Sequence, residues 1–234
     1  RSRFTRHGLL CPPPAAAPRE FAAALLEVVQ REGIDLVVPV TDASILALAQ
    51  SREELECHTR LALAEAEALA AAADKQQTLQ MAQRLGVPVP RTRLVHSAAE
   101  ALRFADELGW PLVVKPQASR VLGPNSSIDA FTVGYADGPA RLANQVGRVA
   151  ARCPVLLQEY VAGTGHGVEL LLHQGRPLAA FQHRRLREIP ISGGVSSLRV
   201  SVPLDPQLYD YSLRLLGELR WTGLAMVEFK LAAD

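Results

Sequence analysis

Apolar and polar residues follow helical and strand-like spacing in turn along the chain. The segment from Arg19 to Glu32 repeats apolar side chains at helical spacing, and IDLVVPV (residues 34–40) follows as an apolar run typical of a buried strand. Directly after it, Thr41 or Asp42 can cap a short helix. This order predicts a βα layer of a parallel sheet. Because the segment holds one clear strand and a parallel sheet needs several, we expect further strands to precede Arg1.

The alanine-rich stretch from residue 61 to residue 90 predicts a helix and a domain boundary. Its sequence, LALAEAEALAAAADKQQTLQMAQRLGVPVP, favours a helix up to Gly86, where a glycine followed by prolines ends it. We place the boundary near Asp74. Residues 1–73 then form a partial α/β domain, and residues 74–234 form a second domain.

The second domain opens with a helix signal and a loop rich in small residues. Ser97 and Glu100 have the spacing of a capping box, and Gly109 closes the helix that they begin. The loop ASRVLGPNSS (residues 118–127) can fold its backbone N–H groups around phosphate, although it lacks the Walker pattern; an ordinary hairpin loop is the alternative. The other expected elements are the strand PLVVKP, a strand near Phe131 to Val133, a helix from Pro139 to Arg152, the strands PVLLQEYV, GVELLLH, PLAAFQHRR and GVSSLRVSV, a helix from Pro206 to Arg220 and the strand GLAMVEFKL.

Two lysines, Lys115 and Lys75, occupy positions at which a bound anion would be favourable. Lys115 closes an apolar strand just before Pro116, so its ammonium is carried on a rigid stem toward the strand end. Lys75 lies in the first turn of its helix, where a cation opposes the helix dipole unless an anion is near. Both are phosphate-binding candidates; the alternative is a pair of solvated surface lysines.

Arginines concentrate in QHRRLRE (residues 182–188), just before the glycine-containing ISGGVSS. Guanidinium groups beside backbone donors suit a carboxylate or an acyl phosphate, with Arg185 as the first candidate and Arg184 as the second. A solvated strand face is the alternative. We interpret His183 as structural, and His166 either as part of the site or as an exposed turn residue.

The last strand carries a glutamate in an apolar setting. Strand alternation places Ala225, Val227, Phe229 and Leu231 on one face and Met226, Glu228 and Lys230 on the other. Glu228 then faces a site, or else forms a neighbour pair with Lys230 on a solvated face.

Composition narrows the range of partners. The chain of 234 residues is 48% hydrophobic, and its 25 basic and 24 acidic residues nearly cancel, so no overall charge favours nucleic acid. No apolar run reaches the roughly 20 residues that span a bilayer. Cys11, Cys57 and Cys153 are scattered without metal-ligand spacing, and the first residues lack the apolar region of a secretory signal. We therefore expect a cytoplasmic protein with small-molecule partners.

Five of these pieces, in order, resemble the ATP-grasp superfamily, which includes biotin carboxylase, carbamoyl-phosphate synthetase and D-alanine–D-alanine ligase. They are DK before a helix ending LGVPVP, PLVVKP with its loop, LLQEYV, GVELLL and MVEFK, and they span residues 74–234. FQHRRLREIPISGGVSS looks most like predicted bacterial ATP-dependent carboligases. In that subgroup, residues 1–69 would correspond to the latter part of the small α/β domain that precedes the grasp domain.

The resemblance implies a fold and a role for each candidate residue. The fold class is α/β with α+β grasp character: a lid subdomain at about 90–160 and a C-terminal subdomain at 161–234. The implied roles are phosphate binding for Lys75 and Lys115, adenine binding for the hinge Gln158, Glu159, Tyr160 and Val161, ribose binding for Glu169, carboxylate binding for Arg185 and Arg184, and magnesium (alternatively manganese) binding for Glu228.

The implied reaction is ATP-dependent ligation, in which a substrate carboxylate becomes an acyl phosphate that an amine-type nucleophile attacks. Since the family supplies further metal ligands on a strand after MVEFK, we expect the chain to be truncated at both ends and inactive by itself. A homodimer is compatible with the resemblance. Two alternatives remain open: a nucleotide-binding module without turnover, and a Rossmann oxidoreductase, although no G-x-G-x-x-G follows a strand.

Overall fold

The computed structural model describes residues 3–118, 120–122, 128–130, 133–189 and 195–232. Contacts divide the chain into one unit of Arg1–Leu63 with Arg120–Asp129 and a second unit of Ala64–Ser119 with Ala130–Asp234. Most of the loop at 118–127, part of the strand expected near 131–133 and all of ISGG (residues 191–194) lie outside the described residues. The domain boundary near Asp74 stays a prediction.

The first unit is a small α/β layer. Its elements are the helices α1 (Pro18–Glu32), α2 (Asp42–Gln50) and α3 (Arg52–Glu56), the parallel strands β1 (Leu36–Val37) and β2 (Arg60–Leu61), and, later in the chain, the paired strands β5 (Arg120–Leu122) and β6 (Ile128–Ala130). Thr41 caps α2, because its hydroxyl oxygen accepts a hydrogen bond from the Ser44 N–H at 3.2 Å. This confirms the predicted helix start.

The expectation of a buried strand at residues 34–40 is wrong. Only β1 is regular, and the side chains around it are open: Leu36 is 53% and Val40 75% exposed. Among the described residues β1 has one neighbouring strand, β2, and of its two residues Val37 packs against the small core while Leu36 does not. An apolar run is buried only where neighbours cover both of its faces.

The predicted long helix is two helices, α4 (Ala66–Ala73) and α5 (Lys75–Arg84). Asp74 separates them with φ −92° and ψ 106°, outside the helical region. Its Oδ1 accepts hydrogen bonds from the Gln76 N–H at 2.8 Å and the Gln77 N–H at 3.2 Å, so it caps α5. Alanine content alone does not reveal this break.

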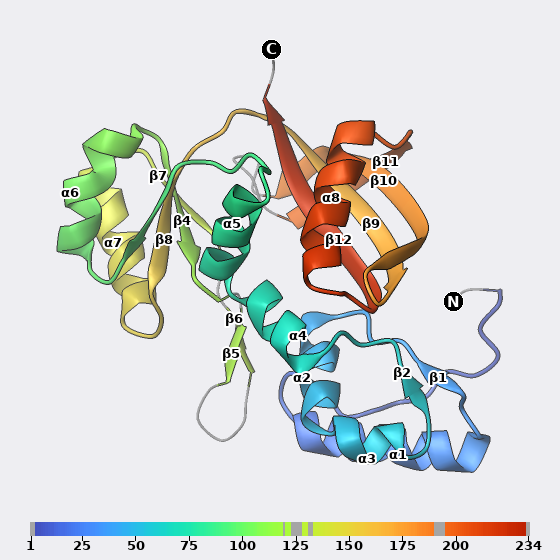
Figure 1. Ribbon diagram of the computed structural model, residues 1–234. Coiled ribbons are helices and arrows are strands. Elements are labelled where there is room, and N and C mark those ends of the chain that lie inside the picture. Colours follow the sequence, from blue (N-terminus) through green and yellow to red (C-terminus); the bar gives the residue numbers. More distant parts are fainter. Residues whose placement is uncertain (1–2, 119, 123–127, 131–132, 190–194, 233–234) are drawn as a thin grey trace. The chain divides into compact units, whose positions relative to one another are not determined.

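The first sheet of the second unit is antiparallel with the order β3-β8-β4-β7. Its elements are β3 (Thr92–Val95), α6 (Ala98–Leu108), β4 (Leu112–Pro116), β7 (Gly134–Ala136), α7 (Pro139–Ala150) and β8 (Val155–Glu159). The helices α6 and α7 cover one face (Figure 1), where Leu112, Val114, Val155 and Leu157 are buried in one cluster. The opposite face carries Lys115, and we call it the Lys115 face.

The second sheet is antiparallel with the order β11-β10-β9-β12. Its elements are β9 (Gly163–His173), β10 (Arg176–Ile189), β11 (Val195–Val202), α8 (Pro206–Glu218) and β12 (Gly223–Ala232). Helix α8 packs on one face (Figure 1), and Val168, Leu170, Val227 and Phe229 belong to the clusters there. The opposite face carries Glu228, which confirms the predicted alternation; we call it the Glu228 face.

Candidate functional site

Lys115 is a half-buried cation on the Lys115 face of the first sheet. Alternation places Val113, Lys115, Leu156 and Gln158 on this face, with Lys115 opposite Leu156 and Val113 opposite Gln158. Among the described residues, the Lys115 ammonium has no hydrogen bond or ion pair, and its burial lowers its pKa. A partly desolvated ammonium without a counter-charge favours the binding of an anion.

Lys75 begins α5, and its helix is tied to the end of β4. The Lys75 N–H donates to the Gln117 carbonyl at 3.0 Å, and Gln117 Nε2 donates to Asp74 Oδ2 at 2.8 Å. Both lysines therefore lie next to one junction in the fold. Asp74 already supplies the anion that the start of α5 favours, so the position of Lys75 does not by itself require a phosphate.

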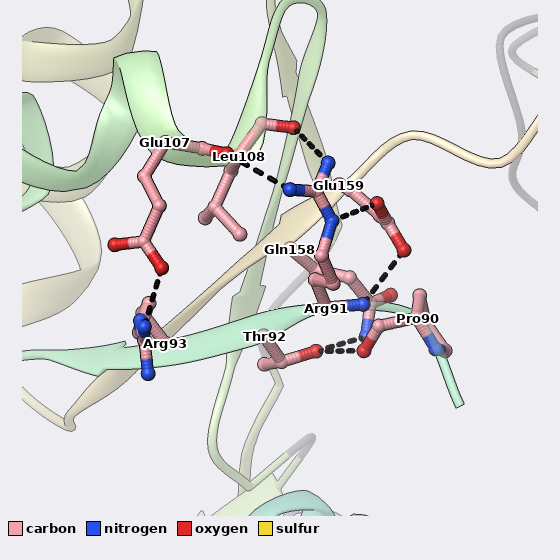
Figure 2. Close-up of polar contacts among 8 residues, drawn as sticks. All are labelled: Pro90, Arg91, Thr92, Arg93, Glu107, Leu108, Gln158 and Glu159. Atoms are coloured by element: carbon pink, nitrogen blue, oxygen red, sulfur yellow. Dashed lines mark hydrogen bonds and ion pairs between the residues drawn. The ribbon is translucent and has the colours of Figure 1, made fainter. Parts of the chain in front are cut away.

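At the end of β8, the side chain of Glu159 is engaged by Arg91 (Figure 2). Glu159 Oε2 accepts from Arg91 Nε at 2.6 Å and Oε1 from the Arg91 N–H at 2.7 Å. Although burial acts in the opposite direction, these hydrogen bonds and the guanidinium charge hold the pKa of Glu159 below its usual value. The Glu159 carboxylate is thus occupied by Arg91 within the chain.

The other predicted hinge residues lie beside Glu159. Gln158 is 4% exposed and donates from Nε2 to Thr92 Oγ1 at 2.9 Å. Tyr160 meets Tyr135 edge to face, with ring centroids 6.1 Å apart, and Val161 follows half-buried in the connection to β9.

Glu169 and His183 form a pair on the Glu228 face of the second sheet. Glu169 Oε1 accepts from His183 Nδ1 at 2.7 Å. Glu169 Oε2 and His183 Nε2 are both buried and, among the described residues, have no hydrogen-bond partner. A buried oxygen without a partner fits the predicted acceptance of a hydroxyl from outside the chain.

Two glycines of β9 leave room for long side chains of β10 to lie over β9 and approach β12. Gly167 lies opposite both His183 and Glu228, and a Cβ there would collide with the His183 ring. A Cβ at Gly165 would lie 2.8 Å from Arg185 Cδ. These positions therefore require glycine if β10 side chains are to reach β12.

Arg185 reaches two carboxylates. Its Nη1 donates to Glu188 Oε1 at 3.2 Å and its Nη2 contacts Glu228, while Lys230 Nζ lies 3.7 Å from Glu188 Oε2. Arg184 lies on the opposite face of β10 from Arg185, as alternation along the strand requires.

The described residues do not form a magnesium site by themselves. Glu228 is half exposed, and its carboxylate contacts Arg185. Over the described ranges, no three His, Cys, Asp or Glu side chains gather closely enough to hold a metal ion. Magnesium prefers six oxygen ligands, and the two carboxylates of this region, Glu188 and Glu228, both contact the Arg185 guanidinium and are too few.

The reading of His166 as a turn residue is wrong, because it lies within β9 and is 8% exposed. Its Nδ1 and Nε2 lie 3.2 Å from Gln182 Nε2 and Thr164 Oγ1, respectively. Burial first, and then the Arg184 charge, lower its pKa, which favours the neutral imidazole.

Sequence reasoning missed Arg91 and Thr92, which hold the hinge from a strand 66 or more residues away. It also missed the rarity of lysine among the basic residues of the chain. Only three of the 25 basic residues are lysines, namely Lys75, Lys115 and Lys230, and two of these are the phosphate candidates.

Comparison with known proteins indicates which proteins this chain resembles in sequence and in fold. No protein-family profile matches the chain. A carbamoyl phosphate synthase large chain of Thermus thermophilus is 37% identical over 219 residues, which cover 90% of this chain and 20% of that protein. The biotin carboxylase of Campylobacter jejuni has a TM-score of 0.70 at 15% identity, over 90% of this chain and 49% of the other.

A third similar structure is the ATP-grasp ligase PsnB, solved with a minimal precursor, Mg and ADP. Its TM-score is 0.52 at 20% identity, over 82% of this chain and 54% of that one. The chain therefore has the ATP-grasp fold, and the predicted fold class and resemblance are confirmed. It spans about half or less of each of these three proteins. Nothing found supports the Rossmann alternative, and no described helix is long and apolar enough to cross a membrane.

Proposed function

We propose that this chain is the ATP-binding part of a ligase that activates a small-molecule carboxylate for attack by an amine-type nucleophile. The observation that carries the proposal is the half-buried Lys115 ammonium, which lacks a counter-charge among the described residues. On an ATP-grasp fold, the anion that suits this position is a nucleotide phosphate. A protein in the cytoplasm, working without nucleic acid as a partner, fits this proposal.

In the proposed reaction, an oxygen of the substrate carboxylate attacks the γ-phosphorus of ATP. The bond between the γ-phosphorus and the bridging oxygen breaks, and ADP leaves with that electron pair. The nitrogen of the second substrate then attacks the acyl carbon, the acyl C–O bond to phosphate breaks and inorganic phosphate leaves with that electron pair, and the nitrogen loses a proton to solvent. Lys115, with Lys75 as the second cation, offsets the charge on the transferring group.

The other candidate residues have binding roles in this proposal. The backbone from Gln158 to Val161 holds the adenine, and Glu169 Oε2 accepts a ribose hydroxyl. Arg185 binds the substrate carboxylate by exchanging it for the contact with Glu228. Arg184 is the weaker candidate because it lies on the other face of β10. Since the described residues do not complete a metal site, we assign no step to magnesium or manganese.

Hydroxylamine trapping tests the proposed intermediate. An acyl phosphate reacts with hydroxylamine to give a hydroxamate, so the complete ligase that contains this chain, with ATP and a panel of carboxylic acids, should yield ATP-dependent hydroxamate with at least one acid. Lys115→Met should abolish this product. Arg148→Met, which removes one charge from the exposed side of α7, should retain it. ATP turnover without hydroxamate from any acid would contradict the acyl phosphate.

The second candidate is a nucleotide-binding module without turnover. The contact between Arg185 and Glu228 favours it, because each neutralises a charge that catalysis would use. Tight ATP binding with no ATP hydrolysis and no hydroxamate would select this function.

A further inference from the structure

A short hydrogen-bond relay holds the side chain of Gln158. Gln158 Nε2 donates to Thr92 Oγ1 at 2.9 Å, and Thr92 Oγ1 donates to the Pro90 carbonyl at 2.9 Å (Figure 2). Thr92 and Gln158 are directly opposite each other in the β3–β8 pair, so the two strands set the separation of these groups.

The relay can run in one direction only. The Pro90 carbonyl has no hydrogen to donate, so the single hydroxyl hydrogen of Thr92 is used there. Thr92 Oγ1 must then accept from Gln158, which requires the NH₂ end of the amide. The reversed amide would need the Thr92 hydroxyl hydrogen for itself, and the hydrogen bond to the Pro90 carbonyl would then be lost. Thr92 therefore fixes Oε1 as the outward end of Gln158.

That outward oxygen lies in the right region for a nucleobase. Gln158 shares the Lys115 face with Lys115 and directly precedes the hinge residues Glu159 to Val161. Among the described residues no group donates a hydrogen bond to Gln158 Oε1, and this atom is not one of the fully buried unpartnered atoms. The site thus offers an oriented acceptor that no residue of the described ranges satisfies.

We infer that Thr92 is a positioning residue that makes Gln158 an acceptor and thereby selects a 6-amino purine over a 6-oxo purine. The inference rests on the nucleotide site of the proposed function. An exocyclic amino group donates to Oε1, whereas a 6-oxo group would place a second acceptor against it. Without the Thr92 hydroxyl, the amide can turn either way and satisfies either base.

The test compares the binding of ATP and inosine triphosphate to the full chain by calorimetry at pH 8. The unaltered protein should bind ATP at least about tenfold more tightly. Thr92→Val keeps the β-branched shape but removes the hydroxyl, and the preference should fall to within about threefold. Thr92→Ser keeps the hydroxyl and should keep the preference.

A double variant separates positioning from a general structural effect. A carboxylate has only acceptor oxygens, so it has no wrong orientation to adopt. Thr92→Val combined with Gln158→Glu should therefore restore the preference for ATP. A purely structural defect in Thr92→Val would not be rescued in this way.

The outcomes distinguish the two proposals. An unaltered chain that binds neither nucleotide overturns the proposed function and this inference together. ATP binding with the same preference in Thr92→Val as in the unaltered protein overturns the role of Thr92 alone. Failure of the double variant to restore a lost preference also rejects orientation of Gln158 as the cause.

Discussion

Removing the Arg91 side chain should loosen the hinge of the first sheet. In Figure 2 the guanidinium makes three contacts with two parts of the fold: Nε donates to Glu159 Oε2 at 2.6 Å, Nη1 to the Glu107 carbonyl at 2.9 Å and Nη2 to the Leu108 carbonyl at 3.0 Å. Glu107 and Leu108 end α6, so Arg91 also places a cation at the negative end of a helix dipole.

The size of the effect follows from these contacts and from their exposure. The Arg91 side chain is 61% and the Glu159 side chain 24% exposed, so solvent screens their attraction and the ion pair contributes about 0.5–1 kcal/mol. The interaction with the end of α6 adds about 0.3–1 kcal/mol. We expect Arg91→Ala to lower the free energy of unfolding by roughly 1–2 kcal/mol.

Urea unfolding followed by circular dichroism measures this loss. Arg93→Ala is the comparison variant, because Arg93 lies two residues further along the chain, in β3, and contacts the half-exposed Glu107 and the Phe104 ring, whose centroid is 5.7 Å from its guanidinium carbon; it should cost less than Arg91→Ala, about 0.5–1 kcal/mol. The Arg91 effect should shrink in acid. Since the pKa of Glu159 is lowered in the fold, its contribution is present above the unfolded pKa and is lost as the pH falls through the folded pKa. Equal losses for the two arginines at pH 7 would refute this reasoning.

Two further predictions concern the second sheet. Burial lowers the pKa of His166, so below about pH 6.5 the unfolded chain binds a proton that the folded chain does not, and unfolding free energy should decrease as the pH falls from 7 to 5.5. His166→Asn should flatten that dependence, and an unchanged slope would exclude His166 as its source. Gly167→Ala should cost about 1–3 kcal/mol in urea unfolding by displacing the His183 ring. Gly147→Ala, in the open on α7, should be neutral or stabilising; equal effects of the two alanines would contradict a required glycine at 167.

Local patterns were sufficient to predict which face each strand residue occupies. The alternation around Glu228 is confirmed, because a strand has a period of two whatever its neighbours are. The helix starts at Thr41 and Ser97 are confirmed for the same reason, since a cap depends on residues three positions apart.

Contacts between distant segments could not be predicted in this way. Asp74 breaks an alanine-rich helix where Gln117 binds it, and Arg91 holds Glu159 from 68 residues away. The exposure of β1 likewise depends on which neighbours cover it. Such features are decided by which strands pair, and a single sequence does not state its pairing.

The central claim is that Lys115 binds a nucleotide phosphate, and calorimetry of ATP binding tests it most directly. Lys115→Met keeps the apolar stem and removes the charge, and loss of a charge-assisted contact should weaken binding about 10- to 100-fold. Arg148→Met, which removes one positive charge from the exposed side of α7, should leave the affinity unchanged. ATP affinity in Lys115→Met equal to that of the unaltered protein would contradict the claim.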